Sequence, residues 1–166
     1  MAVVADARAI ARVRTASWRA AYAGIVPHAI LERLDAEALE ARFEERIAHP
    51  GPASTLVVED RERHVVGFAS VGPARDDDLP GLGEVYAIYL DPAFRGLGFG
   101  RNLFAAALAR LFGAGFGEIV LWVFTDNHPA RRFYERHGFA LDGQARMLDF
   151  DGQPIEEVRY RRSIST

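Results

Sequence analysis

The 166-residue sequence predicts one α/β (α+β) domain over residues 1–166, built on a single mixed sheet with helices on both faces. Three observations predict this fold class. Amphipathic helical stretches come first, and a β-branched hairpin pattern follows them. Two apolar runs typical of buried strands then alternate with two helical stretches, and two short strand patterns close the chain.

The first fifty residues are predicted to be helical. Residues 5–22 place apolar side chains on one helical face and arginines on the other. Residues 27–34 and 36–49 follow as two further helices, and Asp35 is the expected N-cap of the latter.

Beyond residue 52 the pattern changes to strands alternating with helices. Two β-branched runs joined by the polar turn RER predict a hairpin, and a loop over 73–83 separates it from the next strand. The expected strands are 55–60, 64–72, 84–92, 118–124, about 143–150 and 155–162. The expected helices in this region are 101–115 and 128–138.

The composition excludes several kinds of site and partner. No cysteine occurs, so disulfides, thiolate metal ligands and a cysteine nucleophile are excluded. The five histidines show no metal-ligand spacing, so we expect no bound metal. The net charge of −3 gives no electrostatic reason to expect nucleic acid or an anionic membrane as a partner. No apolar run approaches the ~20 residues of a membrane span and no signal-peptide order is present, so we expect a cytoplasmic protein.

The segment RGLGFG lies between a predicted strand and a predicted helix. Gly96, Gly98 and Gly100 would let backbone N–H groups approach an anion, and the following helix would add its N-terminal donors. Arg95 and Arg101 flank the turn and could pair with phosphate oxygens. On spacing alone the alternative, a tight turn that uses glycine only for its conformation, is equally open.

Two common nucleotide sites are excluded by the residues themselves. A dinucleotide site would have G-x-G-x-x-G, whereas the glycines here follow G-x-G-x-G. The acidic residue about twenty positions further on, Glu118, opens a strand instead of ending one. A P-loop needs a lysine, and the sequence contains none.

Two sequence blocks resemble the GNAT superfamily of acyl-CoA-dependent N-acetyltransferases. Residues 95–100 match its R/Q-x-x-G-x-G/A signature, and residues 127–139 match N-x-x-A-x-x-F-Y-x-x-x-G-F. Residues 16–27 look like the acceptor-side helix of small bacterial members, so the resemblance covers about residues 5–162. It implies a mostly antiparallel sheet of about six to seven strands whose fourth and fifth strands splay apart.

The resemblance implies acetyl-CoA as co-substrate, with its pantetheine arm between the two splayed strands. Backbone groups would bind the pantetheine, and backbone amides of the glycine loop would bind the pyrophosphate. The implied donor-binding residues are Ile88, Tyr89, Leu90, Arg95, Gly96, Leu97, Gly98, Phe99, Gly100, Arg101, Asn127 and Tyr134. From the residues alone, Asn127 is a helix N-cap, and the two roles are compatible.

The resemblance also implies direct attack of a neutral amine on the acetyl thioester. Tyr134 falls on the family's general-acid tyrosine, and Glu84 lies where many relatives carry a glutamate that acts as base through water. A backbone N–H near Tyr89 could polarise the thioester carbonyl. The alternatives are that Tyr134 only packs beside Phe133 and that Glu84 is a solvated residue at a strand start.

The acceptor is expected to be a primary amine of a small molecule or a protein N-terminus. Trp18, Tyr22, Ile25 and Glu84 lie where relatives line the amine pocket, although aromatic residues that pack a helix on the sheet would look the same. The run RDDDLP (75–80) could attract a cationic amine or could be a solvated loop. The alternative function is a non-catalytic acyl-CoA-binding or regulatory module on the same fold.

The amino terminus departs from the family pattern. Relatives usually begin with a strand, whereas only the residues MAVV precede the first helix here. The first strand is therefore expected to be short or absent. A misplaced start, a trimmed chain or a sheet edge completed by a second subunit in a homodimer would each explain this.

Overall fold

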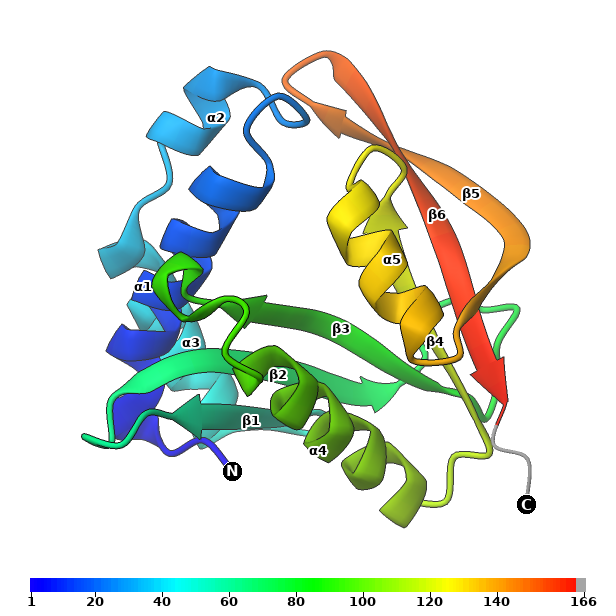
Figure 1. The fold of residues 1–166 in the computed structure, drawn as a ribbon, viewed down its shortest axis with the longest axis horizontal. Coiled ribbons are helices and arrows are strands. Elements are labelled where there is room, and N and C mark those ends of the chain that lie inside the picture. The colour runs from blue at the N-terminus through cyan, green and yellow to red at the C-terminus, as the bar shows by residue number, and fades with distance from the viewer. Residues whose placement is uncertain (164–166) are drawn as a thin grey trace.

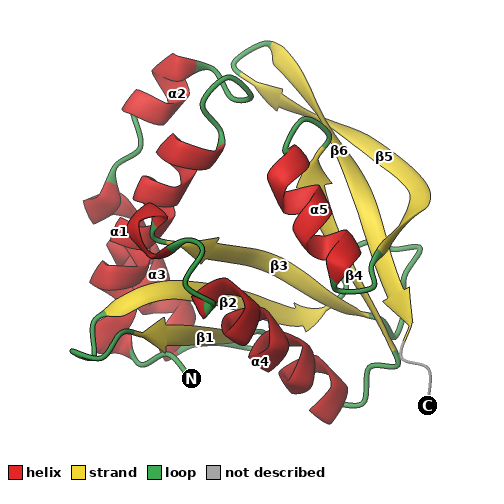
Figure 2. Ribbon diagram, viewed as in Figure 1, coloured by secondary structure: helices red, strands yellow, loops and turns green. Residues whose placement is uncertain are grey.

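The computed structural model describes residues 1–163 and contains one six-stranded sheet (Figures 1 and 2). Its strand order is β1-β2-β3-β4-β6-β5, and every neighbouring pair is antiparallel except β3 and β4. The strands are β1 Ser54–Glu59, β2 Val65–Pro73, β3 Gly83–Leu90, β4 Glu118–Phe124, β5 Ala140–Phe150 and β6 Gln153–Ser163. The helices are α1 Ala7–Ala21, α2 His28–Glu32, α3 Ala36–Ala48, α4 Phe99–Gly113 and α5 His128–Arg136. The predicted fold class is confirmed.

Each predicted element is present, and the differences lie at element ends. The strand expected to reach residue 92 stops at Leu90, because Pro92 opens a short 3₁₀ helix that ends at Phe94. The helix expected from residue 101 begins two residues earlier, at Phe99. This shift brings the last glycine of the RGLGFG segment into the first helical turn.

Helices cover both faces of the sheet (Figure 2). Neighbouring residues of β2 point to opposite sides, so that Ala69 and Val71 pack in one cluster with α4, whereas Phe68 packs in another with α1 and α3. The predicted inward residues of α4 are all buried: Leu103, Ala107, Leu108 and Leu111.

The sheet is divided in its middle. β3 and β4 pair as parallel strands only at Gly83 with Ile119 and at Glu84 with Val120. Beyond these two pairs the strands diverge, and Figure 1 shows the space opening between β3 and α5. The expected splay of the two central strands is thus confirmed, and β3 and β4 are the strands concerned.

No strand precedes α1 in the described part of the chain. Residues 4–6 form a 3₁₀ turn, and the Ala2 amide donates a single hydrogen bond to the Thr55 carbonyl of β1 at 2.9 Å. The edges of the sheet are therefore β1 and β5. Within residues 1–163 no helix combines the length and apolarity that a bilayer span requires.

Candidate active site

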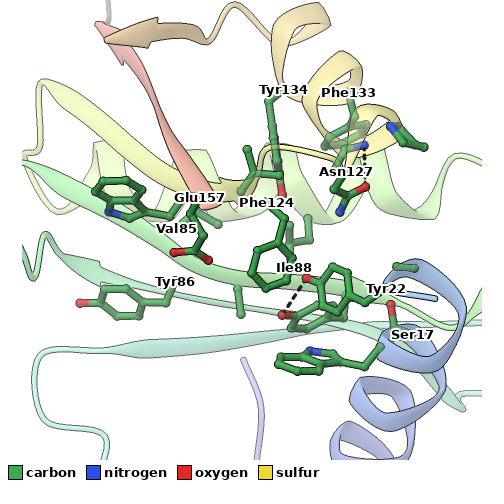
Figure 3. Close-up of a pocket in the computed structure, with 18 of the residues that line it drawn as sticks. Ser17, Tyr22, Val85, Tyr86, Ile88, Phe124, Asn127, Phe133, Tyr134 and Glu157 are labelled. Atoms are coloured by element: carbon green, nitrogen blue, oxygen red, sulfur yellow. Dashed lines mark hydrogen bonds between the residues drawn. The ribbon is translucent and has the colours of Figure 1, made fainter. Parts of the chain in front are cut away.

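A cavity of about 530 Å³ lies where β3 and β4 diverge (Figure 3). Its walls come from α1, β3, the start of α4, β4, α5, β5 and β6, so segments far apart in the sequence contribute. Arg95 and Gly100 line the end beside the glycine loop, and Glu157 lines it from β6. The splayed strands thus create a pocket with two chemically different ends.

The end beside α4 offers free backbone donors. Gly98 is the N-cap of α4 and has no side chain that could accept from the first-turn amides. The Asn102 amide is the first to bond back into the helix, to the Gly98 carbonyl at 3.1 Å. The amides of Phe99, Gly100 and Arg101 therefore remain available to an anion.

The loop reaches this geometry through two left-handed residues. Gly96 has φ +78° and Gly98 has φ +89°, a region that disfavours side chains with a Cβ atom. The loop can be both a tight turn and an anion site, because a turn of this conformation is also what exposes the first-turn amides. Of the residues expected to bind the donor, those that line the cavity are Ile88, Tyr89, Leu90, Arg95, Gly100, Asn127 and Tyr134. Those that lie in the loop or the first turn of α4 but outside the lining are Gly96, Leu97, Gly98, Phe99 and Arg101.

Tyr134 projects from α5 into the cavity and is 9% exposed (Figure 3). Burial raises the pKa of its phenol, so the group keeps its proton at any ordinary pH. Its ring lies 5.6 Å from that of Phe133, so the packing role exists beside any chemical one. No hydrogen bond is recorded for the phenol oxygen within residues 1–163.

Asn127 caps α5 as the sequence predicts. Its Oδ1 accepts from the Ala130 amide at 3.3 Å, and the residue also lines the cavity. Since the cap uses only the carbonyl oxygen, the side-chain NH₂ remains able to donate to a ligand.

Glu84 is buried, so its interpretation as a solvated residue at a strand start is wrong. The residue is 1% exposed and lines the cavity. Its Oε2 accepts from the Arg75 backbone amide at 2.9 Å and from Arg75 Nε at 3.2 Å, and its Oε1 accepts from Arg75 Nη2 at 2.5 Å. A buried carboxylate needs such partners.

The acidic loop over 75–80 is held by an arginine of β6. Arg159 is 4% exposed and donates to Asp142 Oδ2 at 2.6 Å, to Asp78 Oδ2 at 2.9 Å and to Asp76 Oδ2 at 3.3 Å. Trp122 Nε1 also donates to Asp76, at 2.8 Å. Two of the three aspartates are thus engaged with the protein itself, so the loop is not simply solvated.

Of the residues expected on the acceptor side, Trp18, Tyr22 and Glu84 line the cavity and Ile25 does not. Trp18 contributes from α1 and Tyr22 from the C-cap position that follows it, whereas Ile25 packs outside the cavity against the cluster of Val26 and Leu31. The Tyr22 hydroxyl lies 3.3 Å from the Tyr89 hydroxyl (Figure 3). Burial, and then the neighbouring Tyr89, raise the pKa of Tyr22.

Several lining residues were not singled out from the sequence. They are Ser17 on α1, Arg75, Tyr86 on β3, Trp122 on β4, Arg146 on β5 and Glu157 on β6. The alternating pattern of the last two strands indicates that one of Glu156 and Glu157 faces inward, and the strand register then decides which. Among residues 1–163 no group of three His, Asp or Glu side chains is arranged to hold a metal ion.

A divided central sheet beside a helix start that lacks a side-chain cap is the layout that the resemblance to acyl-CoA-dependent transferases implies. Comparison with known proteins makes this specific. Residues 13–139 match the family model described as the acetyltransferase (GNAT) family. The chain belongs to this family and is an acetyltransferase, which confirms the resemblance seen in its two sequence blocks.

Relatives and solved structures agree with this assignment. The chain is 34% identical over 132 residues to the uncharacterized N-acetyltransferase YuaI of Bacillus subtilis, covering 80% of this chain and 73% of the relative. It is 47% identical over 64 residues to the mycothiol acetyltransferase of Mycobacteroides abscessus, covering 39% of this chain and only 22% of that longer protein. The PaiA N-acetyltransferase of Thermoplasma acidophilum, solved with coenzyme A, superposes with a TM-score of 0.74 at 20% identity, over 98% of this chain and 96% of PaiA.

Proposed function

We propose that the chain transfers the acetyl group of acetyl-CoA to a primary amine of a small molecule or a protein N-terminus. The amine would attack directly while both substrates are bound. The observation that carries this proposal is the cavity between the diverging β3 and β4, which reaches from Gly100 in the first turn of α4 to Glu157 on β6. A donor and an acceptor could enter such a cavity from opposite ends.

The chemistry of the donor end fits coenzyme A. The free amides at the start of α4 suit a pyrophosphate, and the positive end of the helix dipole favours its charge. The unpaired edges of β3 and β4 suit an extended arm that carries amides. We propose that the donor contacts backbone groups of Ile88, Tyr89 and Leu90, the loop residues Arg95, Gly96, Leu97, Gly98, Phe99, Gly100 and Arg101, and the side chains of Asn127 and Tyr134.

The bound thioester supplies an activated acyl group, and this chain's residues would move the protons. Acetyl transfer forms a C–N bond and breaks the C–S bond. We propose that the Tyr134 phenol gives its proton to the departing sulfur and regains one from the newly acylated nitrogen through solvent. The backbone N–H near Tyr89 would polarise the carbonyl under attack.

The ammonium form of the amine must first lose a proton, and we propose Glu84 as its acceptor through water. A carboxylate has about four lone-pair sites. Arg75 occupies three of them, two on Oε2 and one on Oε1, so one site on Oε1 is left for a water molecule. The ion pair also fixes the orientation of that site.

We further propose that residues 1–166 act as one domain in the cytoplasm, with neither nucleic acid nor a membrane as partner. A homodimer formed at a free sheet edge stays a prediction. Exposed Leu141 and Met147 on the edge strand β5 mark one such edge. Sedimentation equilibrium of the full chain measures its oligomeric state.

Calorimetry with acetyl-CoA tests the donor directly, and saturable binding below millimolar concentration is expected. A panel of primary amines, assayed by release of the CoA thiol, then tests transfer. Binding of acetyl-CoA without thiol release from any amine would instead favour the non-catalytic acyl-CoA-binding module. Absence of acetyl-CoA binding would rule out both functions.

A further inference from the structure

Glu157 places a carboxylate inside the cavity, on the side away from the glycine loop. It is the cross-strand partner of Phe124, and Figure 3 shows its carboxylate pointing into the cavity. The side chain is 13% exposed. Within residues 1–163 its recorded hydrogen bond is the one that Oε2 accepts from Arg146 Nε, at 3.0 Å. Its Oε1 is therefore available to a bound donor.

The other carboxylate of the cavity is much more fully engaged. Three hydrogen bonds from Arg75 fall on Glu84, and they involve both of its oxygens. Arg75 uses three of the about four lone-pair sites of Glu84, and the proposed water takes the fourth, whereas an ammonium group could add to Glu157 Oε1 without displacing Arg146. Glu157 is thus the better partner for direct contact with a cation.

Aromatic rings form the surroundings of this carboxylate. A continuous edge-to-face series runs from α1 to β5, in which the ring centroids of Trp18 and Tyr22 are 5.0 Å apart, those of Tyr22 and Phe124 4.9 Å, and those of Phe124 and Phe150 5.8 Å. Such faces attract a cation by their quadrupole and pack against apolar groups. A neutral aromatic wall and one carboxylate together favour an ammonium group attached to an apolar body.

The remaining charges favour a single positive group. Arg75 lies 4.4 Å from the Tyr86 ring centroid and Arg146 4.1 Å from that of Trp122, and each arginine is paired with a glutamate of the cavity. Asp76 pairs both with Arg146, at 3.4 Å, and with Arg159, at 3.3 Å, so it adds no uncompensated charge to this end. Glu157 Oε1 therefore offers a site for one cation; a second cation would find two arginines beside it, and a carboxylate of the acceptor would face two glutamates.

Resting on the proposed acetyl transfer, we infer that Glu157 binds the ammonium group of the acceptor, and that the acceptor is a monocationic primary amine with an apolar body. Glu157 Oε1 accepts from the ammonium while the rings of Tyr22 and Phe124 contact the adjoining apolar atoms. Glu84 keeps the separate role of proton acceptor through water.

A matched pair of ligands measures this contact without turnover. 2-Phenylethylamine carries the ammonium group, and 2-phenylethanol has nearly the same shape without the charge. Titrated calorimetrically against the full chain, with and without saturating CoA, the wild-type protein should bind the amine at least tenfold more tightly than the alcohol. In Glu157→Gln this preference should fall below threefold.

Two variants complete the design. Glu156→Gln makes the same chemical change on the adjacent residue, whose side chain is exposed and bonded to Thr125 outside the cavity lining, and should leave the preference intact. Glu157→Asp keeps the charge and should retain part of the preference. With acetyl-CoA, the KM for 2-phenylethylamine should rise at least tenfold in Glu157→Gln, with a smaller change in kcat and an unchanged Kd for acetyl-CoA.

Three results would overturn the inference. They are amine binding by Glu157→Gln within threefold of wild type, no binding of 2-phenylethylamine by the wild type, and tenfold better kcat/KM for spermidine or an amino acid. Failure of the proposed function is distinguishable, because it would appear as absent acetyl-CoA binding by the wild type whatever the amine data show.

Discussion

Replacing Tyr134 with Phe removes one phenol oxygen from the cavity and should affect rate far more than stability. No internal hydrogen bond is recorded for that oxygen within residues 1–163, so the free energy of unfolding should change by no more than ~0.5 kcal/mol. Loss of a general acid typically costs about 10²–10⁴ in rate.

The buried position of Tyr134 sets the expected loss near the lower end of that range. Burial raises the pKa of Tyr134 further above the value of about 8.5 of a free thiol, so its proton moves only as the C–S bond breaks. We therefore expect kcat to fall by about 10²-fold, or ~2.7 kcal/mol in activation free energy. The Kd for acetyl-CoA should stay within about threefold, or ~0.7 kcal/mol.

Steady-state CoA release, calorimetry and thermal melting measure the three quantities. Tyr160→Phe is the matched control, because its ring lies 6.5 Å from that of Tyr134 but its hydroxyl donates to Glu135 at 2.7 Å. The control should lose about 1 kcal/mol of stability and keep its kcat. A Tyr134→Phe variant with kcat within threefold of wild type would refute the acid role.

Other perturbations test the loop, the charge network and the buried phenols. Gly98→Ala places a Cβ at φ +89° and should cost about 1–2 kcal/mol of stability and weaken acetyl-CoA binding, whereas Gly113→Ala, at the helical end of α4, should do neither. Arg159→Gln removes the charged partner of Asp78 and Asp142 and leaves Asp76 with Arg146 alone, so it should cost about 3 kcal/mol in urea unfolding; a loss no larger than that of exposed Arg136→Gln would contradict the network. Because burial raises the pKa of Tyr134, the unfolded chain ionises first above about pH 10, so stability should fall there by up to ~1.4 kcal/mol per pH unit, and less steeply in Tyr134→Phe. Melting temperatures between pH 9 and 11 measure this slope.

The sequence predicts the proposed donor end of the cavity better than the proposed acceptor end, for a physical reason. Local signals specify the glycine loop and the Asn127 cap, because each is formed within a few consecutive residues. Contacts between residues that are far apart in the sequence have no such local signal. Glu84 meets Arg75 across a loop, so its burial could not be read from its place at a strand start.

The acceptor side also depends on strand register. Glu157 faces the cavity because it pairs with Phe124 on one side and Arg146 on the other. An irregularity between Leu141 and Ala145 shifts the pairing of β5, and a shift of one residue turns every following side chain to the opposite face. The amino acid pattern alone does not fix that offset.

The short pairing between β3 and β4 also has a kinetic consequence. Beyond Gly83 and Glu84, the strand edges that face each other lack partners in the sheet, so their amides should exchange hydrogen with solvent quickly. Saturation with acetyl-CoA should slow exchange selectively in the segment that ends at Leu90, while the outer hairpin of β1 and β2 changes little. Deuterium uptake, measured peptide by peptide, would then show whether acetyl-CoA occupies the gap between β3 and β4.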